Sequence, residues 1–342
     1  MSGLESRKIL HKVAKAYYED ALTQEKIGQR FGLSRIRVSR LLRQARDERI
    51  VQISIVAPDD GRVDLERAIE ARYGLDEALI ADPTDGHPAS MLAALGEAAA
   101  ACLMRTLHGE ETVALSWGNH LLATVDALKG ATAMPIRDWA AMRVVQSLGG
   151  LGDPEAEVYG AGLTNRLAHT LGAKAHLLSA PGIVDNPAVC QALRADAQIG
   201  RTLALAARAD IALMGIGALR YPSVGTQTNT LTAEVFAELQ ELGAIGDIGL
   251  RFFDAEGRTI DHEVNGRIVG LTLKQLKGIP RVLGVAGGPG KYEVVRAALR
   301  GNLLNVLVTD ENTARCLLEE PDLDHMQLSA AGNIPSQERV NS

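Results

Sequence analysis

The segment TQEKIGQRFGLSRIRVSRLL, residues 23–42, has the spacing of two short helices joined by a tight turn. Thr23 and Ser34 are suited to begin the two helices, because their hydroxyls can accept hydrogen bonds from unpaired backbone N–H groups. Gly32 suits the turn, since glycine adopts positive φ without a steric cost, and Gly28 would let the second helix approach closely. Apolar residues recur between these points at helical intervals. The segment therefore predicts a helix-turn-helix.

The second helix, predicted from about Arg35 to Glu48, would carry an outward face rich in arginine. Guanidinium groups can bond guanine edges bidentately or clamp phosphates. We expect contacts with duplex DNA from seven residues of this segment: Ser34, Arg35, Ile36, Arg37, Ser39, Arg40 and Arg43. A plain helical hairpin is the alternative, although it would not need the turn glycine and serine together with four arginines.

The sequence on either side extends this N-terminal unit. Apolar residues from Ile9 to Tyr18 fall at helical intervals and predict a preceding helix. Val51–Val56 alternates with period two, which predicts a strand that could form a wing beside the recognition helix.

Charge is distributed unevenly along the chain. The 342 residues have a net charge of −6. Residues 1–60 hold 12 Lys and Arg against 8 Asp and Glu, a net of +4, and the remaining residues hold 24 against 34, a net of −10. Such asymmetry indicates an anionic partner for the N-terminal unit, because basic side chains displace counterions from phosphates. A solvated, charged helix face is the alternative explanation.

Composition places the chain among soluble globular proteins with room for two domains. Apolar residues make up 46% and charged residues 23% of the sequence. The longest apolar stretch, Met91–Met104, is interrupted by Glu97 and is too short for a bilayer span, so it predicts a helix against a core. The N-terminus lacks the pattern of a signal peptide, and three cysteines are widely spaced, so we expect a cytoplasmic protein.

Beyond residue 61 the chain alternates short β-branched or leucine-rich runs with helical stretches. This alternation predicts an α/β fold, a doubly wound and mostly parallel sheet with helices on both faces. The predicted strands are Thr112–Ser116, Val144–Leu148, Ala175–Leu178, Ile211–Ile216, Ile248–Phe253, Val282–Ala286 and Asn305–Thr309. The predicted helices include Gly160–Leu171, Gln198–Ala207, Leu231–Leu242, Tyr292–Arg300 and Glu311–Glu319.

Turn residues mark the domain boundary. Ala57–Gly61 is rich in Pro, Asp and Gly, and Val63–Tyr73 has helical spacing. We expect a DNA-binding domain over residues 1–57, a linker helix over 58–75, a second domain over 76–330 and a flexible tail over 331–342.

Ligand-binding residues of such a sheet lie where its strands end. Ser116, Gly118 and Asn119 end one strand and open a helix, which offers a hydroxyl, an amide and backbone N–H groups suited to anions or sugar hydroxyls. Gly149–Gly150 and Gly215–Gly217 end two further strands, where a ligand could approach the backbone. Ordinary turns are the alternative for each glycine pair.

Two further segments could contribute to the same site. Gly287–Lys291, which includes Gly288, is a glycine turn that could give a phosphate backbone donors and one cation, although it lacks the spacing of a nucleotide-binding P-loop. Asp247 precedes a predicted strand and could accept hydrogen bonds from vicinal hydroxyls, with capping or a turn role as the alternative.

Catalytic hypotheses find little support in the sequence. Ser116, Asp254 and His262 occur in the order of a hydrolase triad, but that order is easily met in a long chain. The histidines and cysteines show no paired metal-ligand spacing. We therefore expect no catalytic residues, no metal and no cofactor.

The sequence resembles the SorC family of sugar-responsive bacterial transcriptional regulators along nearly its whole length. The segments between Gly284 and Glu311 are the most specific part of this resemblance. The matching segments are Gly32–Leu42, Ser116–Gly118, Gly215–Gly217, Gly246–Asp247, Gly284–Lys291, Ala298–Gly301 and Leu307–Glu311.

The resemblance implies a sugar-binding effector domain similar in fold to sugar-phosphate isomerases but used for binding. It also implies a homo-oligomer, a dimer or commonly a tetramer, on double-stranded operator DNA. Its partners would be that DNA and a sugar, polyol or sugar phosphate, with no membrane. The effector-binding residues are then Ser116, Gly118, Asn119, His120, Asn165, Gly217, Asp247, Gly288 and Lys291.

One position departs from the family pattern. Relatives usually carry Thr two residues after the Ser-Trp-Gly turn, where this chain has His120. The missing hydroxyl makes a free polyol or sugar as good a candidate as a phosphorylated effector. An isomerase-like enzyme of sugar phosphates with a DNA-binding appendage is the alternative function.

Overall fold

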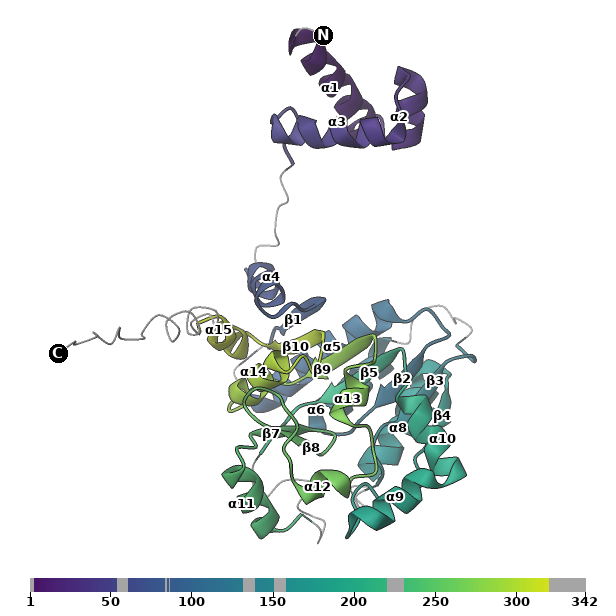
Figure 1. The fold of residues 1–342 in the computed structure, drawn as a ribbon, viewed down its shortest axis with the longest axis vertical. Coiled ribbons are helices and arrows are strands. Elements are labelled where there is room, and N and C mark those ends of the chain that lie inside the picture. Colours follow the sequence, from purple (N-terminus) through teal and green to yellow (C-terminus); the bar gives the residue numbers. More distant parts are fainter. Residues whose placement is uncertain are drawn as a thin grey trace, which may run out of the picture. The chain divides into compact units, whose positions relative to one another are not determined.

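The computed structural model describes residues 3–53, 61–83, 85, 87–131, 139–150, 158–219 and 231–319. The chain divides into two compact units, Met1–Asp59 and Asp60–Ser342 (Figure 1). Each unit has its own buried core, which is expected of independent domains.

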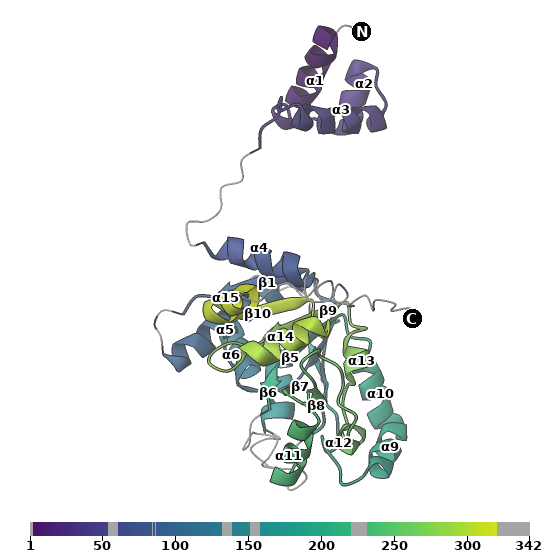
Figure 2. The same ribbon diagram turned by 60° about the vertical axis from the view of Figure 1, so that its left-hand side comes forward.

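The first unit is the predicted helix-turn-helix with one preceding helix (Figure 2). Its helices are α1 (Gly3–Tyr18), α2 (Gln24–Phe31) and α3 (Arg35–Asp47). Thr23 caps α2 by accepting a hydrogen bond from the Lys26 N–H, and Ser34 caps α3 in the same way. Gly32 ends α2 with φ of 67°, as the turn requires. The sequence prediction of these elements is confirmed.

The core of this unit joins all three helices. Val13 of α1, Ile27 of α2 and Val38 of α3 are each fully buried. Gly28 allows a close approach, as we expected, at the point where the chain enters α3. A Cβ there would lie 2.6 Å from the Leu33 carbonyl oxygen, so the close approach is to the turn rather than to the body of α3.

The predicted wing strand is not seen in the part of it that the structure describes. Residues 51–53 adopt no strand, and residues 54–56 lie outside the described residues. Period-two alternation is weak support for a strand that has no partner to pair with.

The second unit is built on a parallel sheet of seven strands in the order β1-β10-β9-β5-β2-β3-β4. Its strands are β1 (Glu77–Ala81), β2 (Thr112–Leu115), β3 (Arg143–Gln146), β4 (Lys174–His176), β5 (Ile211–Gly215), β9 (Arg281–Val285) and β10 (Val306–Asp310). The doubly wound fold is confirmed. From β2 the chain winds outward to β3 and β4, whereas from β5 it winds the other way, so the winding direction reverses between β2 and β5.

A small antiparallel sheet corrects one predicted strand. Ile248–Phe253 is not one strand but parts of two, β7 (Gly246–Ile248) and β8 (Arg251–Phe253), which pair with each other. Strand β7 also pairs with β6 (Gly217–Ala218) on its other side. Gly249 and Leu250 join β7 and β8, with φ of 59° and 61°. Two successive residues with positive φ form the tight turn typical of hairpins, and an apolar run conceals it.

Helices cover both faces of the parallel sheet (Figures 1 and 2). The ordinary helices of this unit are α4 (Arg62–Tyr73), α5 (Pro88–Thr106), α6 (Asn119–Ala131), α8 (Leu163–Leu171), α9 (Pro187–Ala195), α10 (Ala197–Ala206), α11 (Ala233–Glu241), α12 (Glu263–Gly266), α13 (Leu273–Leu276), α14 (Tyr292–Arg300) and α15 (Glu311–Glu319). A π-helical turn, Val158–Gly162, precedes α8.

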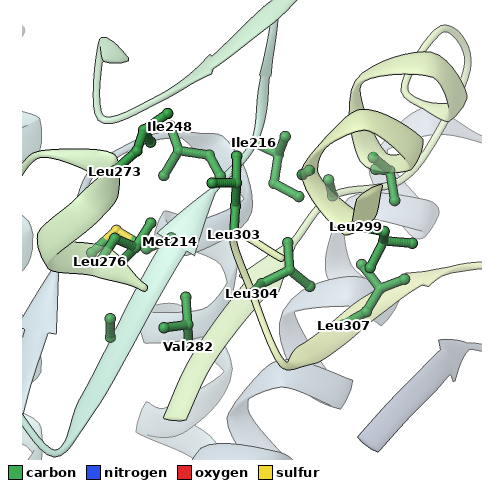
Figure 3. Packing of buried hydrophobic residues seen from close by; sticks show 14 of the residues in the cluster. Met214, Ile216, Ile248, Leu273, Leu276, Val282, Leu299, Leu303, Leu304 and Leu307 are labelled. Carbon is green, nitrogen blue, oxygen red and sulfur yellow. The ribbon is translucent and has the colours of Figure 1, made fainter. Parts of the chain in front are cut away.

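Alternation along the strands directs side chains into two cores. Val113 and Leu115 of β2 pack with α5, α6 and α8, whereas Ala114 between them packs on the opposite face with α10, α13 and α14. Figure 3 shows the second core, in which Met214 of β5 and Val282 of β9 lie near Leu276 of α13. The sheet is therefore buried on both sides, as the apolar strand sequences predict.

Helix α4 packs with the second unit. Its Ile69 is fully buried in the same core as α14 and α15, and Tyr73 donates a hydrogen bond to the Leu317 carbonyl oxygen. The predicted linker helix is thus part of the body of that unit. The predicted tail, residues 331–342, lies outside the described residues. Across the described helices, none is long and apolar enough to cross a membrane.

Candidate functional site

The outward face of α3 is exposed and positively charged. Arg35, Arg40 and Arg43 are all exposed, and within the described residues none of them pairs with a carboxylate. Together with Ile36 and Ser39 they line a shallow concavity of about 420 Å³. Four-residue spacings relate Arg35 to Ser39, Ser39 to Arg43 and Ile36 to Arg40, so these residues share one side of the helix. Unpaired guanidinium groups on such a surface can bind phosphates and base edges.

Two of the expected DNA-contacting residues lie differently. Arg37 does not line the concavity, because it lies two residues, or about 200° around the helix, from both Arg35 and Ser39. The Ser34 hydroxyl accepts a hydrogen bond from the Arg37 N–H at 3.2 Å, so it serves first as a helix cap.

Two features of the α3 face add to the sequence prediction. Gln24, the first residue of α2, lines the same concavity, and its position directly after the Thr23 cap could have pointed to it. Ile36 is 68% exposed, which is unusual for an isoleucine in a folded unit with an apolar core of its own. An apolar side chain on this face can contact the thymine methyl group in the major groove.

The principal cavity of the second unit lies where the winding direction of the sheet reverses. It has a volume of about 310 Å³ and is lined by residues that follow β2 and β5. Open α/β sheets bind their ligands at this position. The expected residues that the structure brings together here are Ser116, Gly118, Asn119, His120, Gly217, Asp247 and Lys291.

Aromatic and aliphatic side chains form the other wall of this cavity. Trp117 follows β2, Phe236 comes from α11 and Phe252 from β8. They belong to the third apolar core of the chain, which packs the small sheet against α11. Apolar walls with a few convergent polar groups are typical of small-molecule sites.

Asp247 has a structural contact as well as a place in the cavity. Its Oδ2 accepts a hydrogen bond from the Leu250 N–H at 2.8 Å, which supports the positive-φ turn between β7 and β8. Burial raises the pKa of this carboxyl above its ordinary value, while the Leu250 N–H and the charge of Lys291 act in the opposite direction. The carboxylate is therefore held by the protein in a place where ligand hydroxyls could also reach it.

Lys291 lies at the start of α14 and points back toward the strand ends. Its Nζ donates a hydrogen bond to the Ile216 carbonyl oxygen at 2.6 Å. Ile216 follows β5 directly, so the ammonium group is fixed between the ends of β5 and β9. A glycine turn before the lysine makes this approach possible, with φ of 91° at Gly288 and 77° at Gly290.

His120 lies in the first turn of α6 with an uncharged imidazole at neutral pH. Burial and the nearby positive charge of Lys291 lower the pKa of His120 to about 4. A hydrogen bond with the Gly287 backbone opposes that shift. An uncharged imidazole has one N–H donor and one acceptor nitrogen, so His120 offers a ligand an acceptor as well as a donor.

A second cavity adjoins the first. It has a volume of about 770 Å³ and shares Asn119, His120 and Lys291 with the principal cavity. Gly288 lines only this second cavity, together with residues of α5 and α15. The glycine turn that we predicted as part of the site therefore borders the second cavity and not the principal one.

Asp310, which the sequence did not single out as a site residue, holds this glycine turn. It is 2% exposed, and its Oδ2 accepts hydrogen bonds from the Gly288 N–H at 2.7 Å and the Thr313 hydroxyl at 2.6 Å. Its Oδ1 accepts a third from the Thr313 N–H. The position of Asp310 between a strand and a helix was the available signal, since acidic residues cap helices there.

Asn165 is not brought to either cavity. It is an exposed residue of α8, and α8 packs on β3 and β4 rather than at the ends of β2 and β5. The resemblance that suggested Asn165 is thus not matched by its place in this structure.

The hydrolase triad is not assembled. His262 caps α12 and its Nε2 contacts Glu238 at 3.0 Å, whereas Asp254 is bound by Arg258. Ser116 is buried at the end of β2 with neither residue among the walls of its cavity. Searching the described residues reveals no cluster of three or more His, Cys, Asp or Glu that could hold a metal ion.

Comparison with known proteins relates both units to regulators. Residues 58–319 match the family described as "Putative sugar-binding domain", and residues 8–48 match "Sigma-70, region 4". The chain is 32% identical over 322 residues to the transcriptional regulator LsrR of Enterobacter sp. (strain 638), covering 92% of this chain and 94% of that protein. It is 30% identical to the deoxyribonucleoside regulator of Bacillus subtilis, covering 92% and 99%.

A solved structure agrees with this relationship. The full-length sorbitol operon regulator SorC from Klebsiella pneumoniae superimposes with a TM-score of 0.69 at 28% identity, covering 92% of this chain and 99% of that one. These relatives are all named as regulators, and LsrR as a transcriptional one, which argues against the isomerase-like enzyme that we considered as the alternative. The chain belongs to the SorC family of sugar-binding transcriptional regulators.

Proposed function

We propose that this regulator reads operator DNA with the outward face of α3 and that a sugar, polyol or sugar phosphate in the principal cavity changes its operator affinity. The cavity at the reversal between β2 and β5 is the observation that carries the second half of the proposal. Operator reading is supported by Arg35, Arg40 and Arg43 on the α3 face, which form no ion pair with any residue that the structure describes.

In the DNA complex, Arg35, Ser39, Arg40 and Arg43 approach the major groove, with Ile36 between them. Gln24 at the start of α2 lies beside the DNA backbone, where a helix N-terminus favours phosphate. Arg37 and Ser34 are secondary, because one faces away from the concavity and the other caps the helix.

In the effector complex, the polar groups make different contacts with the ligand. Ser116, Asn119 and Asp247 hydrogen-bond ligand hydroxyls, Lys291 adds a cation, and Gly217 gives access to the backbone. Trp117 and Phe236 cover the apolar faces of the ligand. Gly288 contributes from the adjoining cavity, and Asn165 makes no direct contact.

Regulation requires that the effector bind two states of the protein with different affinity, since a ligand bound equally by both shifts nothing. We assign the two states to a cytoplasmic homo-oligomer, a dimer or tetramer, that spaces its α3 helices differently on two operator half-sites. Repeated half-sites would then make operator binding sensitive to small changes in that spacing.

The test uses the full-length protein and a duplex from upstream of its own gene. A thermal-shift screen of sugars, polyols and their phosphates first identifies ligands, because a ligand of the native state raises the melting temperature. Fluorescence anisotropy then measures operator affinity with and without each hit. We expect Lys291→Ala to abolish the ligand response and Arg40→Ala to weaken operator binding by about 1–3 kcal/mol. If the protein binds the duplex under none of these conditions, the proposal is contradicted.

A further inference from the structure

Three features of the effector site could attract a phosphate group, and each is compromised by a neighbouring residue. They are the glycine turn Gly287–Gly290, the ammonium group of Lys291 and the N-terminus of α6. Within the part of the chain that the structure describes, these are the features of the site where a phosphorylated effector would place its phosphate.

The glycine turn already binds an anion that belongs to the protein. The Gly288 N–H, which a phosphate would need, donates to Asp310 Oδ2 at 2.7 Å. Asp310 is almost completely buried and makes three hydrogen bonds in all, so moving it would leave a carboxylate and the Thr313 hydroxyl unsatisfied. A second anion placed against this turn would also be repelled by the carboxylate.

Lys291 is only partly available to balance a ligand's charge. Its Nζ donates to the Ile216 carbonyl oxygen, and its charge interacts with Asp247 across the principal cavity. Among the described residues that line the two cavities, Lys291 is the one Lys or Arg, against three carboxylates, those of Asp85, Asp247 and Asp310. This balance of charges opposes a phosphate dianion.

Asn119 and His120 lie at the N-terminus of α6, and the imidazole of His120 is uncharged. In either tautomer of an uncharged imidazole, one ring nitrogen is an acceptor with a lone pair. A lone pair attracts the hydrogen of a hydroxyl group and repels the oxygens of a phosphate dianion. His120 lines both cavities, so a ligand in either one meets it.

We infer that the effector presents a hydroxyl group, not a phosphate, to His120, so that this regulator senses an uncharged sugar or polyol. The inference rests on the proposed function, because it names the class of ligand for the same site. Asp247 and the acceptor nitrogen of His120 then bind hydroxyls from two sides, and Lys291 donates to an oxygen between them.

Matched pairs of ligands test this inference with the full-length protein. Calorimetric titration at pH 7.5 compares sorbitol with sorbitol 6-phosphate, ribitol with ribitol 5-phosphate, and fructose with fructose 6-phosphate, and inorganic phosphate serves as a further probe. We expect binding from the free member of at least one pair, with its phosphate ester at least about tenfold weaker. Inorganic phosphate should neither bind the cavity nor displace that ligand.

Two variants separate the charge of the ring from its shape. His120→Gln keeps an uncharged donor and acceptor, so it should retain the preference for the free ligand. His120→Lys supplies a cation and should shift the preference toward the phosphate ester by about tenfold or more. A phosphate ester that binds the wild-type protein more tightly than its free partner overturns the inference but leaves the proposed function standing. Failure of every pair to bind contradicts the proposed function and the inference together.

Discussion

The DNA-reading face and the effector site differ in how their polar groups are held. On α3 the guanidinium groups of Arg35, Arg40 and Arg43 are exposed and, within the described residues, make no ion pair. In the effector site, Asp247, Lys291 and Asp310 all hydrogen-bond the protein. The α3 face therefore suits a polyanion whose contacts replace water, whereas the effector site is preorganised for one small ligand.

The largest expected effect lies on the α3 face. Arg40→Ala should weaken operator binding by about 1–3 kcal/mol if the guanidinium reads a base, while effector binding stays unchanged. Arg37→Ala is the matched control, because Arg37 is an exposed arginine of the same helix that does not line the concavity. Fluorescence anisotropy at fixed salt measures both.

Random DNA separates base reading from phosphate binding in this variant. Equal losses on operator and random duplexes would reduce Arg40 to a phosphate contact. Equal losses from the Arg40 and Arg37 variants would break the assignment of the reading face itself.

The next largest effect is on the pH dependence of the free energy of unfolding, and it comes from the uncharged state of His120. Its pKa is about 4 in the folded protein, against an ordinary value of 6.5, so the unfolded chain takes up a proton first as the pH falls. Its contribution to stability is therefore complete above pH 6.5 and is lost toward pH 4. Between pH 7 and pH 5 the loss amounts to about 2 kcal/mol.

Denaturant unfolding at pH 7 and pH 5 checks this prediction. His120→Gln cannot take up a proton, so its stability should fall less over the same interval. If the variant and the wild-type protein lose the same stability, His120 is charged or solvated in the folded state, and the contrast between the two regions is weaker than we describe.

A smaller effect, on protein stability and on effector binding, is expected from Asp247→Asn. Burial raises the pKa of Asp247, so its ionisation above about pH 3.8 favours the unfolded chain. Asparagine cannot ionise and can still accept the Leu250 N–H, so the variant should be as stable as the wild-type protein at pH 7, or more stable. It should nevertheless bind the effector more weakly, which calorimetry measures.

Asp254→Asn is the matched control for that variant. Burial alone would raise the pKa of Asp254, but hydrogen bonds from Arg258 hold that pKa below its ordinary value. This substitution should therefore destabilise the protein at pH 7 and leave effector binding unchanged. A destabilised Asp247→Asn variant would show that this carboxylate supports the fold more than the site.

The smallest effect on folding is expected from Ile36→Ala. The side chain is 68% exposed, so the free energy of unfolding, measured by thermal denaturation, should change by no more than about 0.5 kcal/mol. Operator binding should lose discrimination at one A·T pair, because the thymine methyl loses its apolar contact. An unchanged base preference in a binding selection would contradict a reading role for Ile36.

The sequence revealed the DNA-reading unit more completely than the effector site, for a physical reason. The helix-turn-helix is specified by neighbours along the chain. Thr23 and Ser34 indicate where its helices begin, and Gly32 indicates the turn. Only contacts across space, such as Gln24 beside the α3 face, were missed. The alternation of Val51–Val56 corresponds to no strand over residues 51–53, the part of it that the structure describes, because period two alone does not provide a partner strand.

The effector site draws on residues from 116 to 291, so local patterns could locate its parts but not their contacts. Strand ends were correctly expected to converge, since parallel strands end at one edge. The bond from Gly288 to Asp310, the hairpin turn at Leu250 and the absence of Asn165 from both cavities depend on the three-dimensional arrangement. The shift in the pKa of His120 likewise depends on Lys291, which is distant in sequence.

Thermodynamic reciprocity tests the coupling between the two regions most directly. If the effector changes operator affinity by a given factor, operator DNA must change effector affinity by the same factor. Calorimetric titration of the identified effector into the free protein and into its operator complex measures this second factor. We predict that it equals the factor obtained from operator binding with and without effector. Equal effector affinities for the free and the DNA-bound protein would contradict the account.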